Sequence, residues 1–179
     1  MKPLALRYGR GFVAALALSA MTACSQATPK TDAIFLVRHA EKTTEKNDPG
    51  LTEAGKARAE ALADRLEDEG ITRIYSSDYI RTRDTAAPLA ERLGLEIEIY
   101  DPRDLPGTAE TLKATSGRLL VVGHSNTTPQ LTELLGGDGG TPIVEETEYD
   151  RLYVVTSGDD EPVKSYLTRY GDKSENAGN

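Results

Sequence analysis

Apolar and polar positions beyond residue 32 alternate between two kinds of segment. Continuous apolar runs at 33–37 and 118–122 are typical of strands that are covered on both faces. Residues 71–76 are also predicted to form a strand. Residues 95–100 alternate apolar with acidic positions, which predicts a strand nearer a sheet edge. Two further strands are expected, joined by a hairpin through the turn-rich stretch 158–162, and they cover 151–156 and 163–170.

Helices are predicted between these strands, where apolar residues recur every three or four positions. In the first of them Thr52 is expected to be the N-cap and Gly70 the C-terminal stop. Pro88 lies inside the second helix and is expected to bend it. The four helices are expected over residues 51–69, 79–93, 108–115 and 127–135.

The alternation of strands and helices predicts an α/β domain. We expect a three-layer α/β/α sandwich with a mostly parallel central sheet and helices on both faces. This single domain covers residues 33–171, and residues 172–179 are predicted to be a flexible tail.

The first residues have the composition of a targeting segment. Lys2, Arg7 and Arg10 precede an apolar run over 12–21, and small residues follow. This order predicts a secretory signal peptide over residues 1–23, because the run is too short to span a membrane comfortably. A polar tether is expected over residues 24–32.

Cys24 is the single cysteine of the chain, so no internal disulfide can form. The sequence Met21-Thr22-Ala23-Cys24 resembles the lipobox of bacterial lipoproteins. That resemblance implies lipidation of Cys24 and membrane association through the lipid anchor. Ser25 fits sorting to the periplasmic face of an outer membrane. The alternative is a simple cleaved signal with an incidental cysteine.

The net negative charge of the chain argues against nucleic acid as a binding partner. With 179 residues and a formal net charge of −8, the chain lacks the basic excess that holds nucleic acid by its backbone. A small anionic substrate needs only a local positive pocket, so it is not excluded. No obligate protein partner is predicted.

Both histidines of the chain directly follow predicted buried strands. His39 comes after Arg38 at the end of the strand predicted over 33–37, and His124 follows the strand predicted over 118–122. Arg81 lies about one helical turn into the helix that follows the strand predicted over 71–76. Because ligands bind beyond the carboxyl ends of the strands in open α/β sheets, we expect these side chains to converge. Two arginines and two imidazoles suit a tetrahedral oxyanion, and the cations favour a neutral, nucleophilic histidine.

Three blocks of sequence carry a family resemblance. Leu36-Val37-Arg38-His39-Ala40-Glu41-Lys42 resembles the Arg-His-Gly signature of the histidine phosphatase (phosphoglycerate mutase-like) superfamily, with alanine in place of glycine. Residues 75–86 and 121–125 resemble the second and third blocks of that superfamily, in the same order. The resemblance implies the phosphoglycerate mutase-like fold.

The resemblance also implies roles for individual residues. His39 would take the phosphoryl group, while Arg38, Arg81 and His124 would bind its oxygens, and no metal or other cofactor is implied. The remaining assignments are substrate contacts from Glu41, Lys42 and Ser125 and a candidate general acid among Asp101, Asp104 and Glu110. Part of the family has its acid directly after the second histidine, but Ser125 occupies that position here. The three acids are candidates for the other placement, after the strand over 95–100, and the choice between them stays open.

The predicted activity is therefore hydrolysis of phosphomonoesters or phosphohistidine, with a small phosphorylated substrate. Two alternatives remain: a mutase-type phosphotransferase, and a non-catalytic envelope lipoprotein that binds phosphorylated ligands. For Arg81, the alternative to a phosphate contact is a surface pair with Asp78 or Asp84. A metal site built on the two histidines is disfavoured by the nearby arginines.

Overall fold

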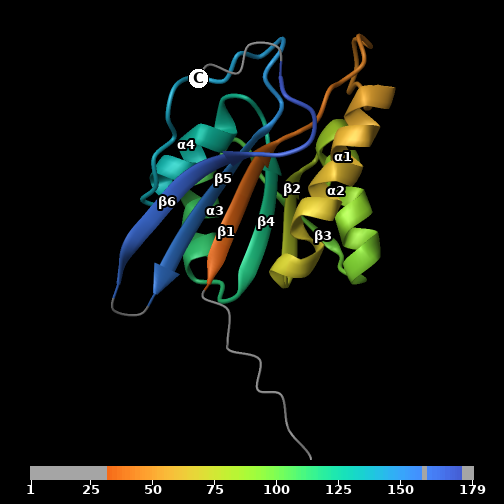
Figure 1. The fold of residues 1–179 in the computed structure, drawn as a ribbon. Coiled ribbons are helices and arrows are strands. Elements are labelled where there is room, and N and C mark those ends of the chain that lie inside the picture. The colour runs from red at the N-terminus through yellow and green to blue at the C-terminus, as the bar shows by residue number, and fades with distance from the viewer. Residues whose placement is uncertain (1–31, 159–160, 175–179) are drawn as a thin grey trace, which may run out of the picture.

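A computed structural model describes residues 32–158 and 161–174 of the chain (Figure 1). The predicted signal peptide, Cys24 and most of the tether lie outside the described residues. The described part contains one six-stranded sheet with the strand order β3-β2-β4-β1-β5-β6. Its strands are β1 (Ala33–Arg38), β2 (Arg73–Ser77), β3 (Ile97–Tyr100), β4 (Arg118–Gly123), β5 (Arg151–Gly158) and β6 (Glu161–Arg169).

The centre of the sheet is parallel, as predicted. Strand β4 pairs in parallel with β1 and β2, and β2 pairs in parallel with β3. Strand β3 is an edge strand, also as predicted, whereas β5 and β6 form the expected antiparallel hairpin on the other side of β1. The carboxyl ends of the four parallel strands therefore meet at one edge of the sheet, the upper edge in Figure 1.

Helices cover both faces of this sheet, which confirms the three-layer arrangement (Figure 1). The helices α1 (Glu53–Leu66) and α2 (Ile80–Leu93) pack on one face, and α3 (Leu105–Lys113) and α4 (Thr127–Leu134) on the other. Alternate residues of β1 divide between the two cores: Phe35 and Val37 face α1 and α2, and Leu36 faces α3 and α4.

The helix boundaries follow from local caps. Thr52 caps α1 as predicted, and its Oγ1 accepts a hydrogen bond from Gly55 N at 3.0 Å. Gly70 ends the following 3₁₀ turn with a φ of 74°, in the left-handed region that favours glycine. Helix α3 begins three residues before the predicted start at 108, because the Asp104 side chain caps it by accepting from Gly107 N.

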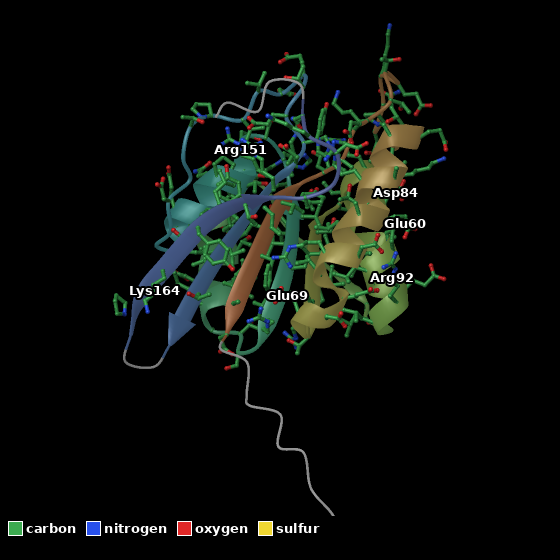
Figure 2. All side chains as sticks on the ribbon, viewed as in Figure 1. Glu60, Glu69, Asp84, Arg92, Arg151 and Lys164 are labelled. Atoms are coloured by element: carbon green, nitrogen blue, oxygen red, sulfur yellow. The ribbon has the colours of Figure 1, made fainter. Side chains whose placement is uncertain are left out.

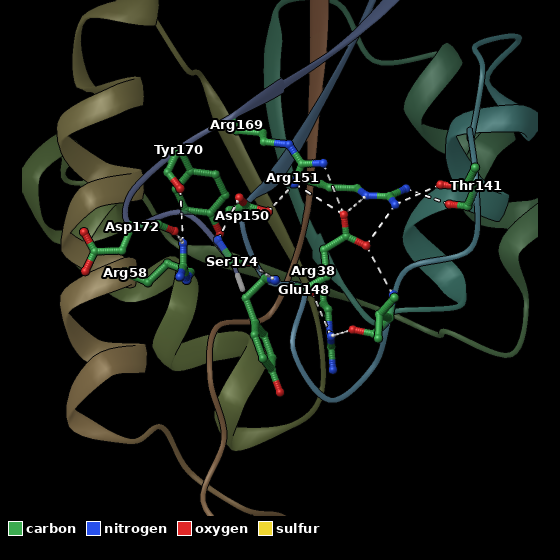
Figure 3. A network of polar contacts seen from close by, with 12 residues as sticks. Arg38, Arg58, Thr141, Glu148, Asp150, Arg151, Arg169, Tyr170, Asp172 and Ser174 are labelled. Carbon is green, nitrogen blue, oxygen red and sulfur yellow. Dashed lines mark hydrogen bonds and ion pairs between the residues drawn. The ribbon is translucent and has the colours of Figure 1, made fainter. Parts of the chain in front are cut away.

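Residues 172–174 belong to the folded domain, so the predicted tail boundary is wrong for them. Arg58 donates hydrogen bonds to the carbonyl oxygens of Tyr170 and Asp172 at 3.1 and 2.9 Å. Ser174 is buried, and its Oγ accepts from Tyr149 N at 2.9 Å while its N–H donates to the Asp150 carboxylate at 3.1 Å (Figure 3). These contacts tie the end of the described chain to the segment before β5.

Arg92 forms several ion pairs on the outer surface of the α1–α2 pair. Arg92 contacts Glu60, Asp64 and Glu67 at 2.7 to 2.9 Å, and Figure 2 places Arg92 and Glu60 on this outer side. Solvent screening leaves such exposed pairs little effect on stability. Within the described residues, no helix combines the length and the apolar character needed to cross a membrane.

Gly55 allows α1 to lie directly on the segment that follows β1. A Cβ at this position would sit 2.2 Å from the carbonyl oxygen of Glu41. We therefore predict that Gly55→Ala lowers the free energy of unfolding by about 1–3 kcal/mol through overpacking, measured by urea denaturation. Gly50→Ala is the matched control, because its nearest neighbour, Ile80 Cγ2, lies at an ordinary 3.7 Å. Equal stability of the two variants would contradict this packing.

Candidate active site

A polar cavity of about 530 Å³ lies at the sheet edge where β1, β2 and β4 end. Its lining contains both histidines and the arginine that follows β2, so the structure confirms the predicted convergence of these three side chains. The lining residues are His39, Lys42, Tyr79, Arg81, Pro102, His124, Ser125, Asn126, Thr127 and Glu145.

The backbone and one ring nitrogen of His39 are fixed by hydrogen bonds. Its N–H donates to the carbonyl of Gly123 at 2.9 Å, which joins the ends of β1 and β4. Its Nδ1 lies 2.8 Å from the carbonyl oxygen of Ala40. Because a carbonyl only accepts, Nδ1 must carry the proton and Nε2 must hold the free lone pair. No residue of the described chain hydrogen-bonds to this Nε2.

The surroundings of His39 keep its imidazole neutral. Burial lowers its pKa to about 3, and the charges of Arg38 and Arg81 act in the same direction. The hydrogen bond to Ala40 opposes the shift without reversing it. At neutral pH the ring therefore presents an uncharged nitrogen to a cavity that carries positive charge.

His124 lies beside His39 in the opposite tautomer. The two ring centroids are 5.5 Å apart, and the planes meet at 69°. Arg81 donates to His124 Nδ1 at 3.4 Å, so Nε2 carries the proton and donates to Ser77 Oγ at 2.9 Å. Ser77 in turn donates to Thr82 Oγ1 at 3.2 Å. Burial lowers the pKa of His124 to about 4, helped by the charges of Arg81 and Arg38.

Asp48 holds Arg81 at the cavity. Its carboxylate lies 3.5 Å from Arg81 NH1 and also accepts from Ile80 N at 3.1 Å, so it caps α2 from a distant loop. The Tyr79 ring lies 4.4 Å from the Arg81 guanidinium carbon. The alternative surface pairs are not formed: Asp78 pairs with Arg83, and Asp84 is exposed on the outer side of the helices (Figure 2).

Arg38 lies beneath the cavity rather than in its lining. Arg38 is 1 % exposed, and its guanidinium donates to the carbonyl oxygens of Val144, Glu145 and Glu148 at 2.5 to 3.4 Å. The ring of Tyr149 lies 4.1 Å from its Cζ. Its Nε is buried without a hydrogen-bond partner, as is the Nε of Arg81. Two unsatisfied buried N–H groups beside one cavity are unusual and suit a bound anion.

A buried network of ion pairs supports the loop that Arg38 holds (Figure 3). Glu148 is 2 % exposed, and its carboxylate contacts Arg151 at 2.7 Å and Arg169 at 3.3 Å. The same carboxylate accepts from Val144 N at 3.2 Å, which closes the 144–148 turn. Asp150 pairs with Arg169 at 2.5 Å. These contacts fix the turn relative to β5 and β6.

The predicted substrate contacts are only partly brought to the cavity. Lys42 and Ser125 line it. Glu41 does not: it forms a two-oxygen contact with Arg58 Nε at 2.9 and 3.0 Å, directed toward the chain end and a separate cavity. Glu41 therefore does not lie where the substrate contact was expected, because its carboxylate is the partner of the almost fully buried Arg58.

None of the three candidate general acids lines the cavity. Asp101 and Asp104 line a different cavity, and Asp104 is occupied as the cap of α3. Glu110 is exposed on α3. Sequence reasoning missed Tyr79, Asp48, Ser77 and Glu145, and of these only Ser77 and Tyr79 stand in a strand-end position that could have indicated the site.

The described residues contain no group of three or more His, Cys, Asp or Glu side chains placed to hold a metal ion. The two histidines instead face arginine and hydroxyl groups.

Both imidazoles are predicted to stay neutral from pH 8 down to pH 5. The pKa values of His39 and His124 lie below the usual range, so protons bind only as the pH falls toward about 3 and 4. Long-range ¹H–¹⁵N NMR spectra should show His39 protonated on Nδ1 and His124 on Nε2, with assignment through His124→Asn. A ring that titrates near the ordinary value of about 6.5 would contradict this electrostatic environment.

Part of the chain is similar in sequence to known proteins. The family model for the histidine phosphatase superfamily (branch 1) matches residues 34–102. A 77-residue segment is 38% identical to "Probable phosphoglycerate mutase GpmB" of Yersinia enterocolitica and covers 39% of this chain. The match spans 35% of that relative, about a third of its length.

Solved structures match over a larger part of the chain. The protein histidine phosphatase SixA complexed with tungstate has a TM-score of 0.59 at 18% identity, over 76% of this chain and 96% of that one. A mycobacterial glucosyl-3-phosphoglycerate phosphatase has a TM-score of 0.58 at 18% identity, over 79% and 99%. At these identities the likeness shows the fold. With the family-model match over residues 34–102, it supports the expected resemblance to the histidine phosphatase superfamily.

Proposed function

We propose that this protein is a phosphatase that hydrolyses phosphomonoesters or phosphohistidine through a covalent phosphohistidine on His39. The observation that carries the proposal is the Nε2 lone pair of His39. It is left free by the Nδ1 hydrogen bond to Ala40, and His39 shares a cavity with Arg81 and His124. A neutral imidazole beside fixed cations can attack an anionic phosphorus centre.

In the first step His39 Nε2 attacks phosphorus, and the bond to the leaving oxygen breaks. Charge on the transferred oxygens is stabilised by the Arg81 guanidinium and by the buried positive charge of Arg38. The unpaired Nε groups of these two arginines are the donors that a bound oxyanion would satisfy. Water then attacks the phosphohistidine, which releases phosphate and restores the lone pair of His39.

The solved relatives support an oxyanion site. SixA, a protein histidine phosphatase, was solved with tungstate, and the mycobacterial glucosyl-3-phosphoglycerate phosphatase with inorganic phosphate. Both tungstate and phosphate are tetrahedral oxyanions, the geometry that paired arginines and imidazoles suit. These bound oxyanions support the proposal of a small phosphorylated substrate for this chain.

A mutase-type phosphotransferase is the second candidate, favoured by the identity to curated relatives named as phosphoglycerate mutases. Both activities form the same phosphohistidine and differ in the acceptor that removes its phosphoryl group. Protein labelled with ³²P on His39 should lose the label to water if it is a phosphatase. Loss of label only after addition of a phosphorylated sugar or acid, with the label recovered on it, would identify a mutase.

The activity is predicted to need His39 and no added metal. Release of phosphate from p-nitrophenyl phosphate in the presence of chelator should fall to background in His39→Ala. Arg81→Ala should lower kcat/KM by about 10²-fold or more, because it removes a transition-state donor. Arg83→Ala is the matched control on the same helix, since Arg83 pairs with Asp78 outside the cavity. Binding of phosphate without turnover in the unmodified protein would instead identify a non-catalytic binder.

We also propose that the protein is exported and anchored by a lipid on Cys24 to the periplasmic face of the outer membrane. Strand β1 begins at the sheet edge opposite the cavity (Figure 1), so a chain entering there would leave the cavity mouth clear. Cells grown with labelled palmitate should label the protein and not a Cys24→Ser variant. A Cys24→Ser variant that is still exported, with no label on the parent protein, would indicate a simple cleaved signal.

A further inference from the structure

Phosphomonoesters with poor leaving groups need a proton donor, and the residues first expected to supply it lie elsewhere. Asp101 and Asp104 line another cavity. Asp48 is close to Arg81, but its two oxygens are engaged by the start of α2 and by that guanidinium. The carboxylates of these residues are therefore not free to face a leaving group.

Glu145 is the single acidic residue among the described residues that line the cavity with His39, Arg81 and His124. Its carboxylate accepts no hydrogen bond from the described part of the chain. It lies close enough to Arg38 for their charges to interact. The residue is exposed where it lines this cavity, so its side chain is open to solvent and to a bound substrate.

The backbone of Glu145 is held firmly, although its side chain is free. Arg38, the residue before His39, donates to the carbonyl oxygen of Glu145 at 2.5 Å and to that of Glu148 at 2.9 Å. The 144–148 turn is closed by Glu148 N donating to Val144 O at 2.9 Å and by the buried Glu148 carboxylate (Figure 3). One guanidinium thus ties the position of Glu145 to the end of β1, directly before His39.

We propose that Glu145 is the general acid and base of the phosphatase. This inference rests on the proposed function. As His39 Nε2 bonds to phosphorus, the electron pair of the breaking P–O bond passes to the leaving oxygen, which takes the proton of the Glu145 carboxyl group. The resulting carboxylate then removes a proton from the attacking water, the P–N bond breaks, and its electron pair returns to His39.

The leaving-group dependence of kcat/KM tests this role. Positioned general acids contribute about 10²–10⁴-fold, and the contribution vanishes when the leaving group needs no proton. Glu145→Gln should therefore lower kcat/KM for an alkyl phosphate such as glycerol phosphate by about 10²-fold and for p-nitrophenyl phosphate by less than about 3-fold. Glu146→Gln is the matched control, because Glu146 follows in the same turn and lines the separate cavity beside Glu41 and Arg58.

Each other outcome overturns the proposal. An equal loss on both substrates would show that Glu145 acts in binding or in the fold, and thermal unfolding of both variants separates these two causes. No loss on the alkyl phosphate would show that Glu145 transfers no proton. If the unmodified protein released no phosphate, or His39→Ala retained full activity, the proposed function itself would fail, a result distinct from any effect of Glu145→Gln.

Discussion

The hydrogen bond from His39 Nδ1 to the carbonyl oxygen of Ala40 is the interaction on which the site depends. It fixes one tautomer and therefore decides which nitrogen can attack. The acceptor is the backbone of the next residue, which itself donates through its N–H to Thr85 in α2 at 2.9 Å. The orientation of the ring is thus set by the fold of β1 against α2, and a substrate has no need to induce it.

Buried positive charge is the second constraint. Arg38 is almost completely buried and donates to backbone carbonyls, so burial lowers its pKa and its charge is not neutralised by a hydrogen-bonded carboxylate. An anion bound above His39 would compensate this cost. The same guanidinium donates to carbonyl oxygens of the 144–148 turn. Glu148 in this turn also forms ion pairs with Arg151 and Arg169. His39, the buried charge of Arg38 and the 144–148 turn at the cavity rim are therefore joined by direct contacts.

Sequence reasoning predicted the fold and the centre of the site for one physical reason. In a parallel sheet the carboxyl ends of strands share an edge, so residues that follow buried strands must meet. His39, Arg81 and His124 were found by that argument, and the structure places all three in one cavity.

The remainder of the site depends on contacts that no local pattern encodes. Asp48 reaches Arg81 across 33 positions, and Arg38 reaches Glu148 across 110. Glu41 lies two positions after His39 in the sequence, yet its carboxylate points away from the cavity because it pairs with the buried Arg58. The 145–150 run has the composition of a solvated loop, and only the tertiary contacts of Arg38 and Glu148 bring Glu145 to the rim. Local spacing could not reveal any of these pairings.

The central claim is that His39 Nε2 faces a tetrahedral anion held by Arg81, beside the ring of His124. A crystal structure of the protein with orthovanadate tests it most directly, because vanadate adopts the five-coordinate geometry of phosphoryl transfer. Vanadium is expected to bond to His39 Nε2, with its oxygens contacting the Arg81 guanidinium and the Nε of Arg38. Vanadate bonded to another residue, or held with His39 bound through Nδ1, would contradict it.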